Sequence, residues 1–160
     1  MIKMARKITD QQDGLLKLAS NTKWNLFITL TFTSTRTQEQ VTKALKVFFL
    51  AIDRTCFGRQ DGYKHVKTFP IIEHTAEATH VHIVMVKPEH YKYAKFRDVL
   101  IKKWQKIKGA GQANLQKSDS EKSWYEQIVD TAPDRKQVIS YMSKQVSKDY
   151  SSVDFENIRI

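Results

Sequence analysis

A chain of 160 residues with 41% hydrophobic and 28% charged side chains lies near the averages of soluble globular proteins, which argues against disorder and low complexity. We expect residues 1–160 to form a single domain, with a core over about 24–150 and a tail over 151–160. The 27 lysine and arginine residues outnumber the 17 acidic residues by ten, which favours a polyanionic partner such as nucleic acid.

The sequence contains no recognisable export or membrane segment. Residues 1–14 hold no apolar stretch of signal-peptide length, and the longest later apolar run, residues 47–52, is too short to cross a bilayer. We therefore expect a protein that is not secreted and has no membrane partner. It would be cytoplasmic in a bacterial or archaeal host, or nuclear if it comes from a eukaryotic virus.

Two kinds of periodicity predict the first half of the fold. Residues 26–33 alternate apolar side chains with threonine, which predicts a strand with its threonines on one face. Thr37 followed by Gln40 resembles a capping box, and apolar residues at helical spacing then predict a helix to about Thr55. Residues 66–73 and 79–86 are strand-like and close enough to form a hairpin.

The second half continues with a basic helix over residues 90–108, whose apolar residues form one stripe. Short strands are expected near residues 113–117 and 124–129, and Pro133 suits the first turn of a final helix that reaches about Tyr150. The order β-α-β-β-α-β-β-α predicts an α+β fold, with a central antiparallel sheet of about five strands and helices packed on one face. The other face would remain open for a ligand.

The stretch THVHIVMV, residues 79–86, places two histidines inside an apolar strand. Side chains two residues apart on a strand share a face, so His80 and His82 stand side by side and could hold one metal ion. A turn of two or four residues pairs His80 with Glu73 on the other hairpin strand, which supplies a third ligand. A turn of different parity would bring His74 to that face instead. Two imidazoles and a carboxylate leave coordination positions open, which suits Mg²⁺ or Mn²⁺ with phosphate oxygens, with Zn²⁺ as a further candidate.

The predicted final helix carries Tyr141 at the margin of its buried stripe, with Lys144 and Lys148 just outside it. A phenol is a weak nucleophile because its pKa is about 10, but neighbouring cations favour the phenolate and also hold a phosphate. The simpler interpretation is an amphipathic tyrosine that packs its ring and exposes its hydroxyl group.

Three stretches, FITLTF at residues 27–32, HVH at 80–82 and YMSK at 141–144, occur in the order of motifs 1, 2 and 3 of the HUH endonucleases. From residue 26 to about 148 the chain resembles the nuclease domain of a rolling-circle replication initiator, or Rep protein. The resemblance implies a ferredoxin- or RRM-like sheet, a divalent ion on the two histidines, and a tyrosine that nicks single-stranded DNA. It also implies that this tyrosine stays joined to the 5′ end of the DNA.

Carried over to this chain, the resemblance makes Tyr141 the nucleophile, His80 and His82 metal ligands, and Lys144 the motif lysine. Glu73 matches the usual third ligand. One turn after Tyr141 the chain has Gln145 and Lys148 rather than a second tyrosine, which indicates a single-tyrosine enzyme. We assign DNA binding to the set Thr29, Thr31, Arg36 and Lys148. The expected partner is single-stranded DNA in an origin hairpin, with a host replication helicase or polymerase as candidate protein partners.

Other interpretations remain open. A single-tyrosine insertion-sequence transposase of the IS200/IS605 type has a similar length, the same histidine pair and a late tyrosine followed by glutamine. A non-catalytic module for single-stranded nucleic acid would stack bases on aromatic residues such as Trp24, Tyr63 and Trp124, and would bind without metal. A cupin-type dioxygenase also uses His-x-His, but the sequence lacks the expected glycines and a further downstream histidine at a suitable spacing.

Overall fold

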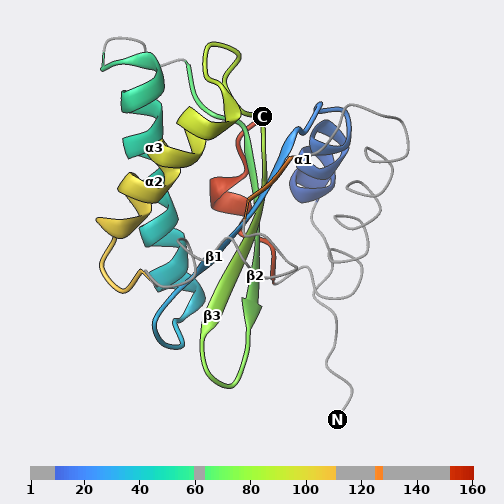
Figure 1. The fold of residues 1–160 in the computed structure, drawn as a ribbon. Helices are drawn as coiled ribbons and strands as arrows, with labels where there is room; N and C mark the ends of the chain where they lie inside the picture. Colours follow the sequence, from blue (N-terminus) through green and yellow to red (C-terminus); the bar gives the residue numbers. More distant parts are fainter. Residues whose placement is uncertain (1–9, 60–63, 111–124, 128–151) are drawn as a thin grey trace.

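The computed structural model describes residues 10–59, 64–110, 125–127 and 152–160 (Figure 1). In chain order its elements are α1 (Asp10–Ser20), β1 (Leu26–Thr31), α2 (Gln38–Phe57), β2 (Thr68–His74), β3 (Thr79–Met85), α3 (Tyr93–Gln105), β4 (Tyr125–Gln127) and a 3-10 turn, η2 (Phe155–Asn157). None of the helices within these ranges is long and apolar enough to span a membrane.

The described strands form one antiparallel sheet in the order β2-β3-β1-β4. This confirms an α+β fold built on an antiparallel sheet. The described ranges contain four strands rather than about five, and the further strand predicted near residues 113–117 lies outside them. Of the strand predicted at 124–129, the structure describes residues 125–127, which form β4. The final helix predicted from Pro133 to Tyr150 also lies outside the described residues.

Helices α2 and α3 cover one face of the sheet (Figure 1). The capping box at the start of α2 is confirmed: the Gln40 amide donates to the Thr37 hydroxyl at 3.2 Å, and the Thr37 amide donates to the Gln40 side chain at 3.0 Å. Trp104 of α3 is completely buried and packs edge-on against both Phe32 and Phe48, with ring centroids 5.1 and 5.3 Å apart. These aromatic contacts join the two helices to the sheet.

The prediction that helices occupy only one face is wrong, because α1 lies on the opposite side of the sheet (Figure 1). Ala19 at the end of α1 and the following Trp24 pack against the sheet residues Phe69 and Val84 in a second apolar cluster. The indole of Trp24 donates a hydrogen bond to the Ala19 carbonyl at 2.9 Å, which fixes the turn between α1 and β1. Part of the face that was expected to be open is therefore covered.

Residues 152–160 pack against the sheet and are not a tail, so the prediction that the core ends near residue 150 is wrong. They run along the outer edge of β2, with backbone bridges between Ile71 and Val153 and between Thr68 and Arg159. Val153 and Ile158 are buried against the second apolar cluster. These residues pack because β2 is an edge strand, whose unpaired backbone groups and apolar side chains need a cover.

Buried polar contacts hold this C-terminal segment in place. The Asn157 amide donates to the Thr42 carbonyl at 3.1 Å and to the Asp154 carboxylate at 2.6 Å, and the Asn157 carbonyl accepts from the Thr68 hydroxyl at 2.8 Å. Burial raises the pKa of Asp154, and the hydrogen bond from Asn157 only partly offsets this effect. The segment is thus tied both to α2 and to β2.

Candidate metal and DNA site

The hairpin of β2 and β3 brings a carboxylate to the two histidines. β2 pairs with β3 so that Glu73 lies opposite His80 and His74 opposite Thr79, which confirms the register predicted for a four-residue turn. Thr75 closes this turn: its backbone amide donates to the Ala78 carbonyl at 3.0 Å, and its hydroxyl accepts from the Ala78 amide at 3.1 Å. Glu73 therefore shares the histidine face, and His74 belongs to the other face.

Glu73 contacts the histidine diagonally opposite it. Its carboxylate oxygen Oε2 lies 2.6 Å from Nε2 of His82, and this interaction lowers the pKa of Glu73 below its ordinary value. The His82 side chain is 20% exposed and that of Glu73 is 55% exposed, so the pair lies at the surface and is open to solvent on one side. A ligand could approach the pair from that side.

Two threonines on β1 orient the imidazoles. β1 pairs with β3 so that Thr29 lies opposite His82 and Thr31 opposite His80. The hydroxyl of each threonine lies 3.0 Å from Nδ1 of its histidine. Because both Nδ1 atoms are engaged by β1, the Nε2 atom of each ring is the one available to a ligand.

The donor set suits a divalent ion, although the described side chains are not arranged as a complete site. Among the described residues, no three His, Cys, Asp or Glu side chains converge closely enough to form a metal-binding group. Metal–ligand distances of about 2.0–2.2 Å would hold neighbouring nitrogen and oxygen ligands about 3.0–3.4 Å apart. Glu73 would therefore have to move back from the 2.6 Å contact with His82. As an exposed side chain at the end of an edge strand, it can do so by a rotamer change.

The hydroxyl groups also permit the change of tautomer that a metal requires. In a neutral His82 ring that donates from Nε2 to the Glu73 carboxylate, Nδ1 accepts from Thr29. A ligating Nε2 carries no proton, so the proton moves to Nδ1 and the hydroxyl accepts instead of donating. Sequence reasoning assigned Thr29 and Thr31 to DNA binding and missed this contact with the histidines, although the cross-strand register could have revealed it.

The site lies at a border between polar and apolar halves of one sheet face. Phe27 precedes Thr29 on the same face of β1 and stacks on the His82 ring, with centroids 5.8 Å apart and planes 16° from parallel. Beyond Phe27 lies the cluster that α1 and the C-terminal segment cover. The polar half ends at the hairpin turn, so the site has one apolar wall and one open side.

Of the other predicted site residues, the structure describes only Arg36, whose contacts do not include the histidines. The backbone amide of Arg36 donates to the Thr79 hydroxyl at 2.8 Å, and its guanidinium lies 6.0 Å from the Phe32 ring centre and close against Gly109. Its contacts thus lie at Phe32 after β1, at the start of β3 and in the loop after α3. The set Tyr141, Lys144 and Lys148 lies outside the described residues.

Comparisons with protein-family models, with curated proteins and with solved structures found no match to this chain.

Proposed function

We propose that this protein is a metal-dependent, single-tyrosine endonuclease and strand transferase for single-stranded DNA, of the HUH type, that initiates rolling-circle replication. The observation that carries the proposal is the placement of Glu73, His80 and His82 on the uncovered part of one sheet face, with both Nδ1 atoms held from β1. A non-catalytic binding module gives this arrangement no purpose. The net charge of +10 supports a nucleic-acid partner.

The arrangement of the sheet is compatible with this proposal. The elements β1, α2, β2, β3, α3 and β4 follow the order β-α-β-β-α-β of ferredoxin-like domains, with β1 and β3 adjacent. In such a sheet the two central strands present neighbouring side chains, and here they contribute Thr29, His80 and His82. A fold of this kind supports many functions, so the proposal depends on the site and not on the topology.

In the proposed reaction, the phenolate oxygen of Tyr141 attacks the phosphorus of the scissile phosphodiester. The bond from phosphorus to the 3′ oxygen breaks, the 3′ oxygen takes a proton, and the 5′ phosphate remains esterified to Tyr141. The reverse reaction rejoins the strands at no cost in external energy. A bound divalent ion, Mg²⁺ or Mn²⁺, would polarise the phosphate, with Nε2 of His80, Nε2 of His82 and the Glu73 carboxylate as its protein ligands. Lys144 and Lys148 would add positive charge near the phosphate.

The test is incubation with a pool of single-stranded oligonucleotides in Mn²⁺ or in EDTA, followed by a denaturing gel and peptide mass mapping. We expect a Mn²⁺-dependent nucleotide adduct on Tyr141. Tyr141→Phe should abolish the adduct and leave DNA binding nearly intact, whereas Tyr150→Phe, a matched change in the same predicted helix, should retain it. His82→Ala should remove metal-dependent cleavage.

Tight DNA binding without an adduct on any sequence would instead favour the non-catalytic module. An adduct that persists in Tyr141→Phe would remove Tyr141 from the mechanism. The recognised DNA separates the replication initiator from the insertion-sequence transposase. The initiator should cleave an origin hairpin, and the transposase should cleave transposon ends.

A further inference from the structure

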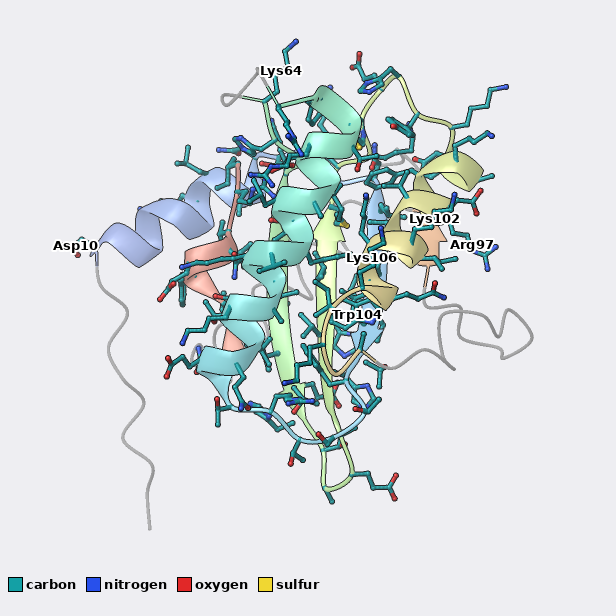
Figure 2. The ribbon with its side chains drawn as sticks, turned by 90° about the vertical axis from the view of Figure 1, so that its left-hand side faces the viewer. Asp10, Lys64, Arg97, Lys102, Trp104 and Lys106 are labelled. Atoms are coloured by element: carbon teal, nitrogen blue, oxygen red, sulfur yellow. The ribbon has the colours of Figure 1, made fainter. Side chains whose placement is uncertain are left out.

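Helix α3 and its flanking residues concentrate the positive charge of the chain. Residues 92–108 contain six lysines and one arginine against a single acid, Asp98, which amounts to a net charge of +6 out of the chain's +10. Lys95 and Lys102 on the helix and Lys106, its C-cap residue, are exposed. Figure 2 views the layer of α2 and α3 from outside and labels Lys102 on α3 and Lys106 at its C-terminal end. Val81 and Ile83 pack in the cluster that α2 and α3 cover, so His80 and His82, which alternate with them on β3, lie on the opposite side of the sheet from α3.

The three exposed lysines form one stripe. At about 100° per residue, positions i, i+7 and i+11 fall within about 40° of one another around the helix axis. With a rise of about 1.5 Å per residue, Lys95 and Lys106 are about 16 Å apart along the axis. One strand of a duplex places a phosphate every 3.4 Å along its axis, so the stripe spans about five phosphates.

The apolar side of α3 shows which kind of polyanion this surface fits. Phe96, Leu100 and Trp104 are completely buried in the core. None of these three side chains is therefore available to insert into a lipid surface beside the lysines. For the same reason the stripe offers neither Phe96 nor Trp104 as a platform for unpaired bases, which proteins that bind single strands commonly use. A duplex keeps its bases stacked inside and presents its phosphates, which lysines bind without stacking.

We infer that the outer face of α3, through Lys95, Lys102 and Lys106, is a docking surface for the phosphate backbone of double-stranded nucleic acid. The contact is independent of sequence and lies on the layer remote from the histidines. It does not depend on the nuclease activity proposed above. A chain that contacts a duplex on one side and a single strand on the other would suit a substrate with both features, such as a hairpin.

The test compares duplex binding by the wild type and by the triple variant Lys95→Gln, Lys102→Gln and Lys106→Gln, measured as fluorescence anisotropy across a range of salt concentrations. The probe is a blunt DNA duplex of random sequence. Loss of three phosphate contacts should reduce the slope of log K against log salt by about 2.7, and should weaken binding at 0.1 M salt by roughly 10²–10³-fold. Circular dichroism checks that the variant is folded.

A matched control removes the same charge elsewhere. Lys17, Lys43 and Lys46 are exposed helical lysines paired with Asp13, Glu39 and Glu156, and changing all three to Gln should leave the salt slope nearly unchanged. Equal losses in the two triple variants would overturn the inference, because they would reflect net charge alone. Two other results for the Lys95, Lys102 and Lys106 variant would overturn it as well. One is weaker binding to an unpaired oligonucleotide than the wild type shows, with duplex binding unchanged. The other is weaker binding to anionic phosphatidylserine vesicles alone. The variant His82→Ala separates this inference from the proposed nuclease activity. It should bind the duplex as the wild type does, whether or not the cleavage assay detects nuclease activity in the wild type.

Discussion

Thr29 offers the sharpest test of the site, because its hydroxyl lies 3.0 Å from Nδ1 of His82 and the substitution Thr29→Val removes this group at nearly constant volume. Without it, the orientation of the His82 ring is no longer fixed from β1, and Nδ1 loses the hydroxyl group that would accept its proton when Nε2 binds a metal. Loss of such a supporting contact typically weakens metal affinity by about 10–100-fold. This corresponds to about 1.4–2.7 kcal/mol of binding free energy.

Isothermal titration with Mn²⁺ measures this effect directly, without DNA. Thr29→Ser is the matched control, because it retains the hydroxyl and should bind Mn²⁺ within a few-fold of the wild type. The substitution Thr29→Val should also lower the free energy of unfolding of the metal-free protein by about 0.5–1.5 kcal/mol, the net value of a typical hydrogen bond. Equal Mn²⁺ affinity in the Val and Ser variants, with both folded, would refute the idea that β1 orients a metal-binding His82.

Two further predictions concern the C-terminal segment. Ile158→Ala should lower the free energy of unfolding by about 2–5 kcal/mol in urea titrations, because Ile158 is buried against the second apolar cluster, whereas the exposed control Leu18→Ala should change it by less than about 0.5 kcal/mol. Equal effects would mean that the segment does not pack. The raised pKa of Asp154 means that the folded protein holds this proton more tightly than the unfolded chain, so its contribution to stability grows as the pH falls through the folded pKa. Asp154→Asn should therefore be neutral or stabilising at pH 7, and should flatten the pH dependence of unfolding on the acidic side. A large loss of stability at pH 7 would show instead that the charge is needed.

Local sequence signals predicted the elements that they specify directly. The Thr37 and Gln40 capping box fixed the start of α2, and the parity of the turn fixed the pairing of Glu73 with His80. Each depends on residues a few positions apart, so no tertiary information was needed.

Long-range packing was not predictable in the same way. The segment after Ser152 has mixed composition and no periodicity, and it packs only because the edge of β2 is apolar and unpaired there. Helix α1 was missed for a similar reason, since its cover of Phe69 and Val84 depends on a sheet face that no local pattern in residues 10–20 reveals. The side-chain contact between Glu73 and His82 was also missed, because the register aligns Glu73 with His80 and only the rotamer selects the diagonal partner.

Helix α1 and the C-terminal segment, whose packing on the sheet the sequence did not predict, also set the apolar limit of the site. Phe27, Phe69 and Val84 occupy the same sheet face as the histidines, and without α1 and the C-terminal segment they would form an exposed apolar patch. The cover ends where the face becomes polar, and Phe27 stacks on His82 at that border. The Phe27 ring stacks on the His82 imidazole, and the Thr29 hydroxyl forms a hydrogen bond with its Nδ1 atom. These two contacts set the position of the imidazole before any ligand binds. A preorganised imidazole of this kind is what a metal or phosphate site requires, whereas a solvated surface histidine would pay the ordering cost on binding.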